Sequence, residues 1–153
     1  MKPVKIDAAT PPGTTFSGPA RRVSLERIWA FSGGPLAAEG WPARNLHTDA
    51  SIAQASGLPT VAASGPQYQG YLIGLLVDLF GSRWLEGGTM DVKFVRLVPA
   101  GAVITPEAVL RRCERVDDRI VYEFDVRCVD ADGELVLVGT ATATLADSPS
   151  SED

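Results

Sequence analysis

The residues best suited to proton-transfer chemistry lie in one short segment, from Asn45 to Asp49. His47 is the only histidine in the 153-residue chain, and an imidazole can take or give a proton near neutral pH. It could act as a general base or acid, or hold the Thr48-Asp49 turn as a structural residue. Asn45 could orient a water molecule or a substrate amide, or bond to its own backbone. Asp49 stands where a helix N-cap is expected, and we interpret it as a cap rather than an acid.

A second candidate group is the backbone of Gly65. The pair Gly65-Pro66 predicts the first turn of a helix. Unpaired N–H groups and the positive end of the helix dipole converge at such a turn. The Gly65 N–H could therefore stabilise negative charge that develops on a substrate oxygen. The alternative is a glycine that only permits a tight turn.

Residues on either side of Gly65 could bind a substrate. We interpret Ser64 as a positioning hydroxyl, because no Gly-x-Ser-x-Gly sequence surrounds it to make it a nucleophile. Gln67 and Tyr68 could line a pocket, although core packing is an equal alternative for the tyrosine. Trp41 could cover the site, or it could anchor the loop in which it lies.

The elements that must position these residues change character along the chain. Helices are predicted first, each marked by a cap or a Gly/Pro stop: 24–32, 50–56 and 65–80. The last of them is apolar on most sides, which indicates a buried helix. Strands follow, separated by Asp- and Gly-rich turns: 90–95, 108–116, 119–129 and 134–145. This order predicts an α+β fold in which a sheet covers the long helix.

Length and composition predict one domain over residues 14–146, with a flexible arm at 1–13 and a disordered acidic tail at 147–153. The net charge of −5 argues against a nucleic-acid or membrane partner. Cys113 and Cys128 are too few for a disulfide framework, and with one histidine they make no metal-ligand cluster. We therefore expect a cytoplasmic protein with free thiols, no leader peptide and no metal.

Four segments follow one another along the chain: Asn45-Leu46-His47-Thr48-Asp49, then 53–58, then Ala63-Ser64-Gly65, then 91–101. In this order they resemble the MaoC-like dehydratase and (R)-specific enoyl-CoA hydratase family. The resemblance implies a hotdog fold, in which an antiparallel sheet wraps one central helix, 65–80. It also implies a homodimer or higher homo-oligomer. The implied substrate is an acyl thioester on coenzyme A or on an acyl carrier protein, with no cofactor beyond that carrier.

One position departs from the family pattern. Hydratases of this family have an aspartate five residues before the catalytic histidine, and the two act as a pair. This chain has Pro42 there, in a loop that looks longer than usual. Glu39 is the nearest carboxylate in sequence that could replace the aspartate.

Three functional hypotheses follow. The first is a lyase that hydrates 2-enoyl thioesters or dehydrates 3-hydroxyacyl thioesters, with His47 as acid/base and the Gly65 N–H as oxyanion donor. The second keeps the fold but changes the reaction to a double-bond shift, a non-water Michael addition or a thioesterase, because a lone histidine base suits such reactions. The third is a non-catalytic subunit that binds acyl thioesters.

Overall fold

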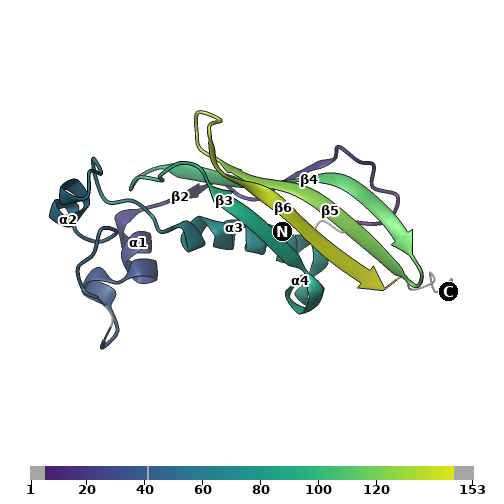
Figure 1. Cartoon of the computed structure of the whole chain (residues 1–153), viewed down its shortest axis with the longest axis horizontal. Helices are drawn as coiled ribbons and strands as arrows, with labels where there is room; N and C mark the ends of the chain where they lie inside the picture. Colours follow the sequence, from purple (N-terminus) through teal and green to yellow (C-terminus); the bar gives the residue numbers. More distant parts are fainter. Residues whose placement is uncertain (1–5, 41, 147–153) are drawn as a thin grey trace.

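The computed structural model of the chain describes residues 6–40 and 42–146. A curved antiparallel sheet covers one long helix, and two short helices lie beyond one end of that helix (Figure 1). The predicted α+β class is confirmed. Trp41 lies outside the described residues, as do 1–5 and 147–153.

The sheet has the strand order β1-β4-β5-β6-β3, and every neighbouring pair is antiparallel. The long strands β4 (Val103–Val116), β5 (Arg119–Val129) and β6 (Leu135–Ala146) form its centre. Short strands β1 (Thr15–Ser17) and β2 (Arg21–Arg22) pair with β4. Strand β3 (Thr89–Phe94) forms the opposite edge, next to β6. The β4–β5 turn at Asp117, with φ of 54°, lies where the sequence predicts it.

The core lies between the sheet and helix α3 (Gly65–Phe80). Helix α3 begins at the predicted Gly65-Pro66 pair and ends at Gly81, whose φ of 66° suits a residue without a side chain. Leu72 and Leu76 are fully buried beneath the sheet. The opposite side of α3 is uncovered at Gly70 and Gly74. One helix therefore has a packed face and an open face.

Two caps predicted from the sequence start the short helices. Ser24 accepts a hydrogen bond from the Arg27 N–H and starts α1 (Leu25–Ser32). A 3-10 turn, η1 (Gly34–Leu36), follows. Asp49 caps α2 (Ala50–Ala55), which confirms its interpretation as an N-cap. The Asp49 cap fixes the C-terminal end of the loop that carries His47.

Some of the architecture differs from the sequence-based prediction. The described part of the predicted arm, 6–13, packs along β4: Ile6 is buried, and the Gly13 N–H donates to the Leu110 carbonyl over 2.7 Å. Strand β4 starts earlier than predicted and includes Pro106. Helix α4 (Ser82–Gly87), β1 and β2 were not predicted. No helix within the described ranges is long and apolar enough to cross a membrane.

Candidate active site

His47 is held by its backbone and by one ring nitrogen. The backbone N–H donates to Asn45 Oδ1 over 2.9 Å, and ring Nδ1 lies 2.8 Å from the Ala62 carbonyl oxygen. A carbonyl only accepts hydrogen bonds, so Nδ1 carries a hydrogen and donates it. In the neutral ring, Nε2 is then the nitrogen with a free lone pair. The half-buried ring therefore offers Nε2 for proton transfer.

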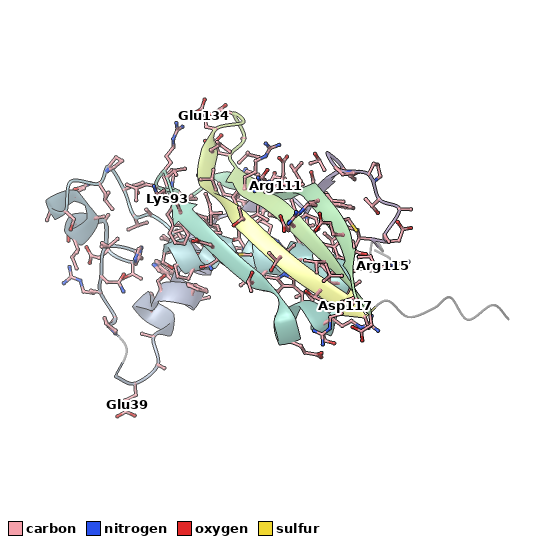
Figure 2. The ribbon with its side chains drawn as sticks, turned by 45° about the vertical axis from the view of Figure 1, so that its right-hand side comes forward. Glu39, Lys93, Arg111, Arg115, Asp117 and Glu134 are labelled. Atoms are coloured by element: carbon pink, nitrogen blue, oxygen red, sulfur yellow. The ribbon has the colours of Figure 1, made fainter. Side chains whose placement is uncertain are left out.

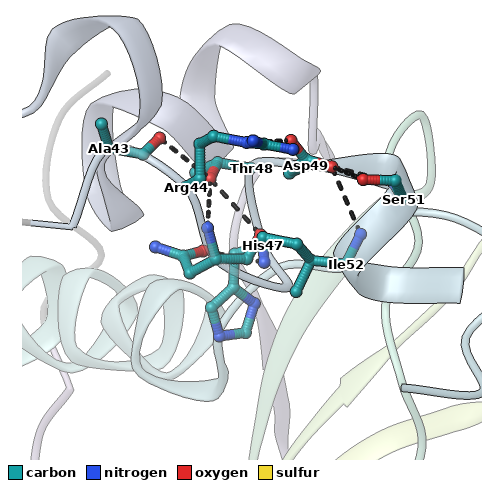
Figure 3. Close-up of polar contacts among 8 residues, drawn as sticks. Ala43, Arg44, His47, Thr48, Asp49, Ser51 and Ile52 are labelled. Carbon is teal, nitrogen blue, oxygen red and sulfur yellow. Dashed lines mark hydrogen bonds and ion pairs between the residues drawn. The ribbon is translucent and has the colours of Figure 1, made fainter. Parts of the chain in front are cut away.

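Asn45 fixes the turn that carries this histidine. Its side-chain oxygen accepts the His47 N–H, and its Nδ2 donates to the Ser32 carbonyl over 2.9 Å. Its own N–H donates to Thr48 Oγ1 over 3.0 Å (Figure 3). Both ends of the amide are engaged in the protein, which favours a positioning role for Asn45. Its predicted contact with substrate or water stays a prediction.

Asp49 is committed to the same loop and to α2. It accepts hydrogen bonds from the backbones of Ser51 and Ile52 and an ion-paired hydrogen bond from Arg44 Nε over 2.6 Å. The Arg44 contact and the further hydrogen bonds hold the pKa of Asp49 well below its ordinary value. The His47 ring points away from this ion pair (Figure 3). An ionised carboxylate so occupied is a poor proton donor.

The start of α3 lies beside the segment that holds His47. The Ala62 carbonyl that accepts from His47 is three residues before Gly65, and Ala63 is fixed by its N–H to the Val98 carbonyl over 2.8 Å. Ser64 Oγ lies 3.3 Å from Ser32 Oγ, which ties the start of α3 to the end of α1. Asn45 bonds the same Ser32. The structure thus brings three predicted site residues, Asn45, His47 and Ser64, into one connected network.

Gly65 is a glycine for a steric reason. A Cβ at this position would lie 2.7 Å from the ring of Phe94, at the end of β3. The Phe94 ring also contacts Tyr68 edge-on, with centroids 5.4 Å apart. The aromatic ring therefore lies directly against the helix start that would donate to an oxyanion. No sequence signal linked Phe94 to Gly65, because the contact joins residues far apart in the chain.

Glu39, the predicted replacement for the family's aspartate, does not lie beside His47. Glu39 lies exposed on a protruding loop and its side chain points away from the body of the molecule (Figure 2). It forms no ion pair or hydrogen bond with any described residue. Pro42 is exposed and has no proton to transfer. What the described residues offer is a single imidazole that is bonded to Ala62, three residues before the start of α3.

The two predicted pocket residues on α3 have different surroundings. Tyr68 is 3% exposed and belongs to the core, where burial raises the pKa of its hydroxyl. Gln67 is 6% exposed and lines a cavity of about 600 Å³. Arg21 and Arg27 line the same cavity, and neither was a predicted site residue. The three residues come from β2, α1 and α3, so no local sequence pattern could reveal that they line one cavity.

Neither cysteine adds a reactive group to this site. Cys128 is fully buried, and burial raises the pKa of its thiol to about 12. Cys113 is partly buried, and its thiol pKa is also raised, mainly by burial. Within the part of the chain that the structure describes, no three His, Cys, Asp or Glu side chains are placed to hold a metal ion.

Fold and site together define an antiparallel sheet around one helix, with a histidine tied to the segment that leads into that helix. This is the hotdog fold, as the sequence resemblance implied. The chain is similar to the MaoC-like dehydratase from Rhodospirillum rubrum, with 21% identity, a TM-score of 0.72, and coverage of 92% of this chain and 95% of that one.

Two further solved structures are similar. The (R)-hydratase from A. caviae involved in PHA biosynthesis has 19% identity and a TM-score of 0.67, over 90% of this chain and 98% of that one. The HadBC (3R-hydroxyacyl-ACP dehydratase) complex from Mycobacterium tuberculosis has 17% identity and a TM-score of 0.62, over 93% and 100%. No protein-family model and no curated protein sequence matches the chain. At these identities the similarity establishes the fold.

Proposed function

We propose that this protein is an acyl-thioester hydro-lyase, which adds water to 2-enoyl thioesters or removes it from 3-hydroxyacyl thioesters. The observation that carries the proposal is the fixed His47 ring: Nδ1 donates to the Ala62 carbonyl, and Nε2 is left for proton transfer near the start of α3. The names of similar structures, a MaoC-like dehydratase and an (R)-hydratase, support the same reaction class.

One imidazole can carry both proton transfers of the reaction. In hydration, His47 Nε2 takes a proton from water while the water oxygen bonds to the β-carbon of the enoyl group. The π electrons move toward the thioester oxygen, and the Gly65 N–H stabilises that enolate oxygen. The protonated ring then returns the proton to the α-carbon. Every bond and proton is accounted for without the carboxylate that Pro42 replaces.

We propose no cofactor, because coenzyme A or the phosphopantetheine arm of an acyl carrier protein enters as part of the substrate. We also propose a homodimer formed through β3. This strand is one edge of the sheet, and Phe94 at its end and Val95 and Leu97 just beyond it are 44%, 47% and 54% exposed. An uncovered edge with apolar side chains can pair with a second copy.

The test is turnover of a short 2-enoyl-CoA by the purified chain. Loss of the conjugated-thioester absorbance is followed, and the product is weighed. His47→Asn keeps a side-chain N–H close to the Nδ1 position, so the contact with Ala62 survives while Nε2 is removed. We expect this variant to be slower by about 10²- to 10⁴-fold. Full activity in folded His47→Asn would overturn the assignment.

Asp49→Asn is the matched control, because it changes a carboxylate of the same loop that serves as a cap. It should retain turnover. If a variant that folds and binds substrate as the wild type does still loses activity as His47→Asn does, then Asp49 takes part in proton transfer and the single-imidazole mechanism is wrong.

A second function has one observation in its favour, which is Pro42 at the position of the family's aspartate. A lone base suits a double-bond shift or the addition of another nucleophile, and the oxyanion donor would also suit a thioesterase. The product mass separates these reactions: one water gained, mass unchanged, nucleophile gained or free thiol released. Binding of acyl thioesters without turnover would instead indicate a non-catalytic subunit.

A further inference from the structure

The open face of α3 forms the floor of the cavity that Gln67 lines. Gly70 and Gly74 lie one helical turn apart on this floor, and a Cβ added at either one meets no atom within 4 Å. Lining residues on α3 run from Gln67 to Asp78, which corresponds to about 16 Å of helix at 1.5 Å per residue. We call this cavity the α3 groove. Its volume of about 600 Å³ is that of a small-molecule site.

Two arginines from different elements line the α3 groove. Arg21 comes from β2, and its guanidinium lies over the ring of Tyr71 at 5.5 Å from the centroid. Arg27 comes from α1. Neither forms an ion pair with a carboxylate of the described ranges. Other arginines do: Arg44, Arg96, Arg111, Arg112, Arg119 and Arg127.

The two arginines without ion pairs make the lining of the groove positively charged. Asp78 is the one carboxylate that lines it, so the two guanidiniums leave an excess of one positive charge among the described lining residues. The whole chain carries a net charge of −5. A positive hollow on an acidic protein attracts anions selectively to that place. Arginine is also the side chain best suited to bind a carboxylate or a phosphate.

Gln67 lines the groove near the start of α3. Gln67 is more than nine-tenths buried, and its Oε1 has no hydrogen-bond partner among the described residues. A buried carbonyl oxygen without a donor is unfavourable. Gln67 lies two residues after Gly65, in the first turn of α3. The groove therefore begins close to the start of the helix that carries Gly65.

We propose that the α3 groove binds the part of the thioester substrate that lies away from the reacting carbons, and that this part carries an anionic group. Arg21 and Arg27 bind the anion. This inference rests on the proposed function, because it names the substrate class of that site. The anion is a carboxylate on the acyl chain or the phosphate of the phosphopantetheine arm.

Binding of saturated acyl thioesters tests the groove without requiring hydration. Calorimetry compares butyryl with succinyl thioesters, each on N-acetylcysteamine and on 4′-phosphopantetheine, using His47→Asn as the background. The succinyl arm reports a carboxylate and the phosphopantetheine arm reports a phosphate. We expect one of the anions to tighten binding at least about tenfold, and Arg21→Gln/Arg27→Gln to abolish that gain. Equal affinity for all four ligands overturns the proposal.

Arg83→Gln is the matched control, because Arg83 is an exposed arginine of α4 that does not line the groove. It should leave the anion preference unchanged. If Arg83→Gln loses the preference as much as Arg21→Gln/Arg27→Gln does, then net charge alone explains the effect and the proposal is overturned. Gly74→Leu fills the groove from a position with free space, and should abolish binding with no change in oligomeric state. If it dissociates an oligomer instead, then the groove is an interface between copies and the proposal is wrong.

Turnover of wild-type protein, measured in parallel, separates the two proposals. His47-dependent hydration with no anion preference overturns the groove and leaves the hydro-lyase. Arginine-dependent binding of an anionic thioester, with no turnover of its enoyl form, overturns the hydro-lyase and leaves the groove as a binding site.

Discussion

Adding one methyl group to Gly139 of β6 should weaken the pairing of β6 with β3, the strand whose Phe94 contacts the candidate site. Gly139 of β6 lies between Val92 of β3 and Val126 of β5. A Cβ at Gly139 would overlap the Asp91 carbonyl oxygen and lie 2.8 Å from the Val92 Cα. These are backbone atoms, so no rotamer change can relieve the contact. Strand β3 must move away from β6, and we expect Gly139→Ala to lower the free energy of unfolding by about 1–3 kcal/mol.

Gly74→Ala adds the same methyl group where the structure leaves room for it. Gly74 is exposed on α3, and its added Cβ meets nothing within 4 Å. Alanine is favoured over glycine in a helix by about 0.8–1 kcal/mol, so this variant should be more stable than wild type. The two alanine variants should therefore differ by about 2–4 kcal/mol with opposite signs.

Urea denaturation at one fixed protein concentration measures both free energies of unfolding, since an oligomer makes stability depend on concentration. A Gly139→Ala protein as stable as wild type would refute the reasoning, because it would show that β3 can separate from β6 freely. Phe94 at the end of β3 could then not be held against Gly65 by strand pairing.

The remaining predictions concern burial and the helix start. The pKa of the Cys128 thiol is raised from its ordinary value of 9.0 to about 12, so above about pH 9 the unfolded chain loses a proton that the folded chain keeps, and stability falls as pH rises toward 12. In Cys128→Ala the free energy of unfolding should fall less steeply with pH, by at most about 1.4 kcal/mol per pH unit. Urea titrations at successive pH values measure this slope. The same slope in the variant and in wild type would contradict the prediction. Gly65→Ala should displace the Phe94 ring from Tyr68, at a cost of about 0.5–1.5 kcal/mol. The cost should vanish in a Phe94→Ala background, and additivity of the two changes in a double-mutant cycle would refute the contact.

The helices could be predicted because their signals are local. Asp49 and Ser24 cap the helices that follow them, and Gly65-Pro66 starts α3. Each signal uses backbone groups within three residues, so a sequence shows it without knowledge of the fold. The resemblance in 45–49 and 63–65 similarly identified the hotdog fold before the sheet was known.

The missed elements depend on distant partners. Strands β1 and β2 are too short to show an alternating pattern, and they exist through pairing with β4. Pro106 hid the start of β4, since proline has no N–H for a ladder and usually argues against a strand. The site shows the same limit. Its contacts are all tertiary: the His47–Ala62 hydrogen bond, the Phe94–Gly65 contact, and the position of Arg21 and Arg27 along one groove.

One helix connects the two proposals mechanistically. The first turn of α3 carries the Gly65 N–H, which we propose as the donor to the substrate oxygen. The same helix continues as the floor of the groove that Arg21 and Arg27 line. An anion held in the groove would fix the distance and angle at which the reacting carbons meet His47. Binding energy from a remote group is then used to orient the reacting atoms, not only to hold the substrate. A thioester that lacks the anion should therefore show a lower kcat as well as a higher KM. A change in KM alone would mean that the groove binds the substrate without positioning it.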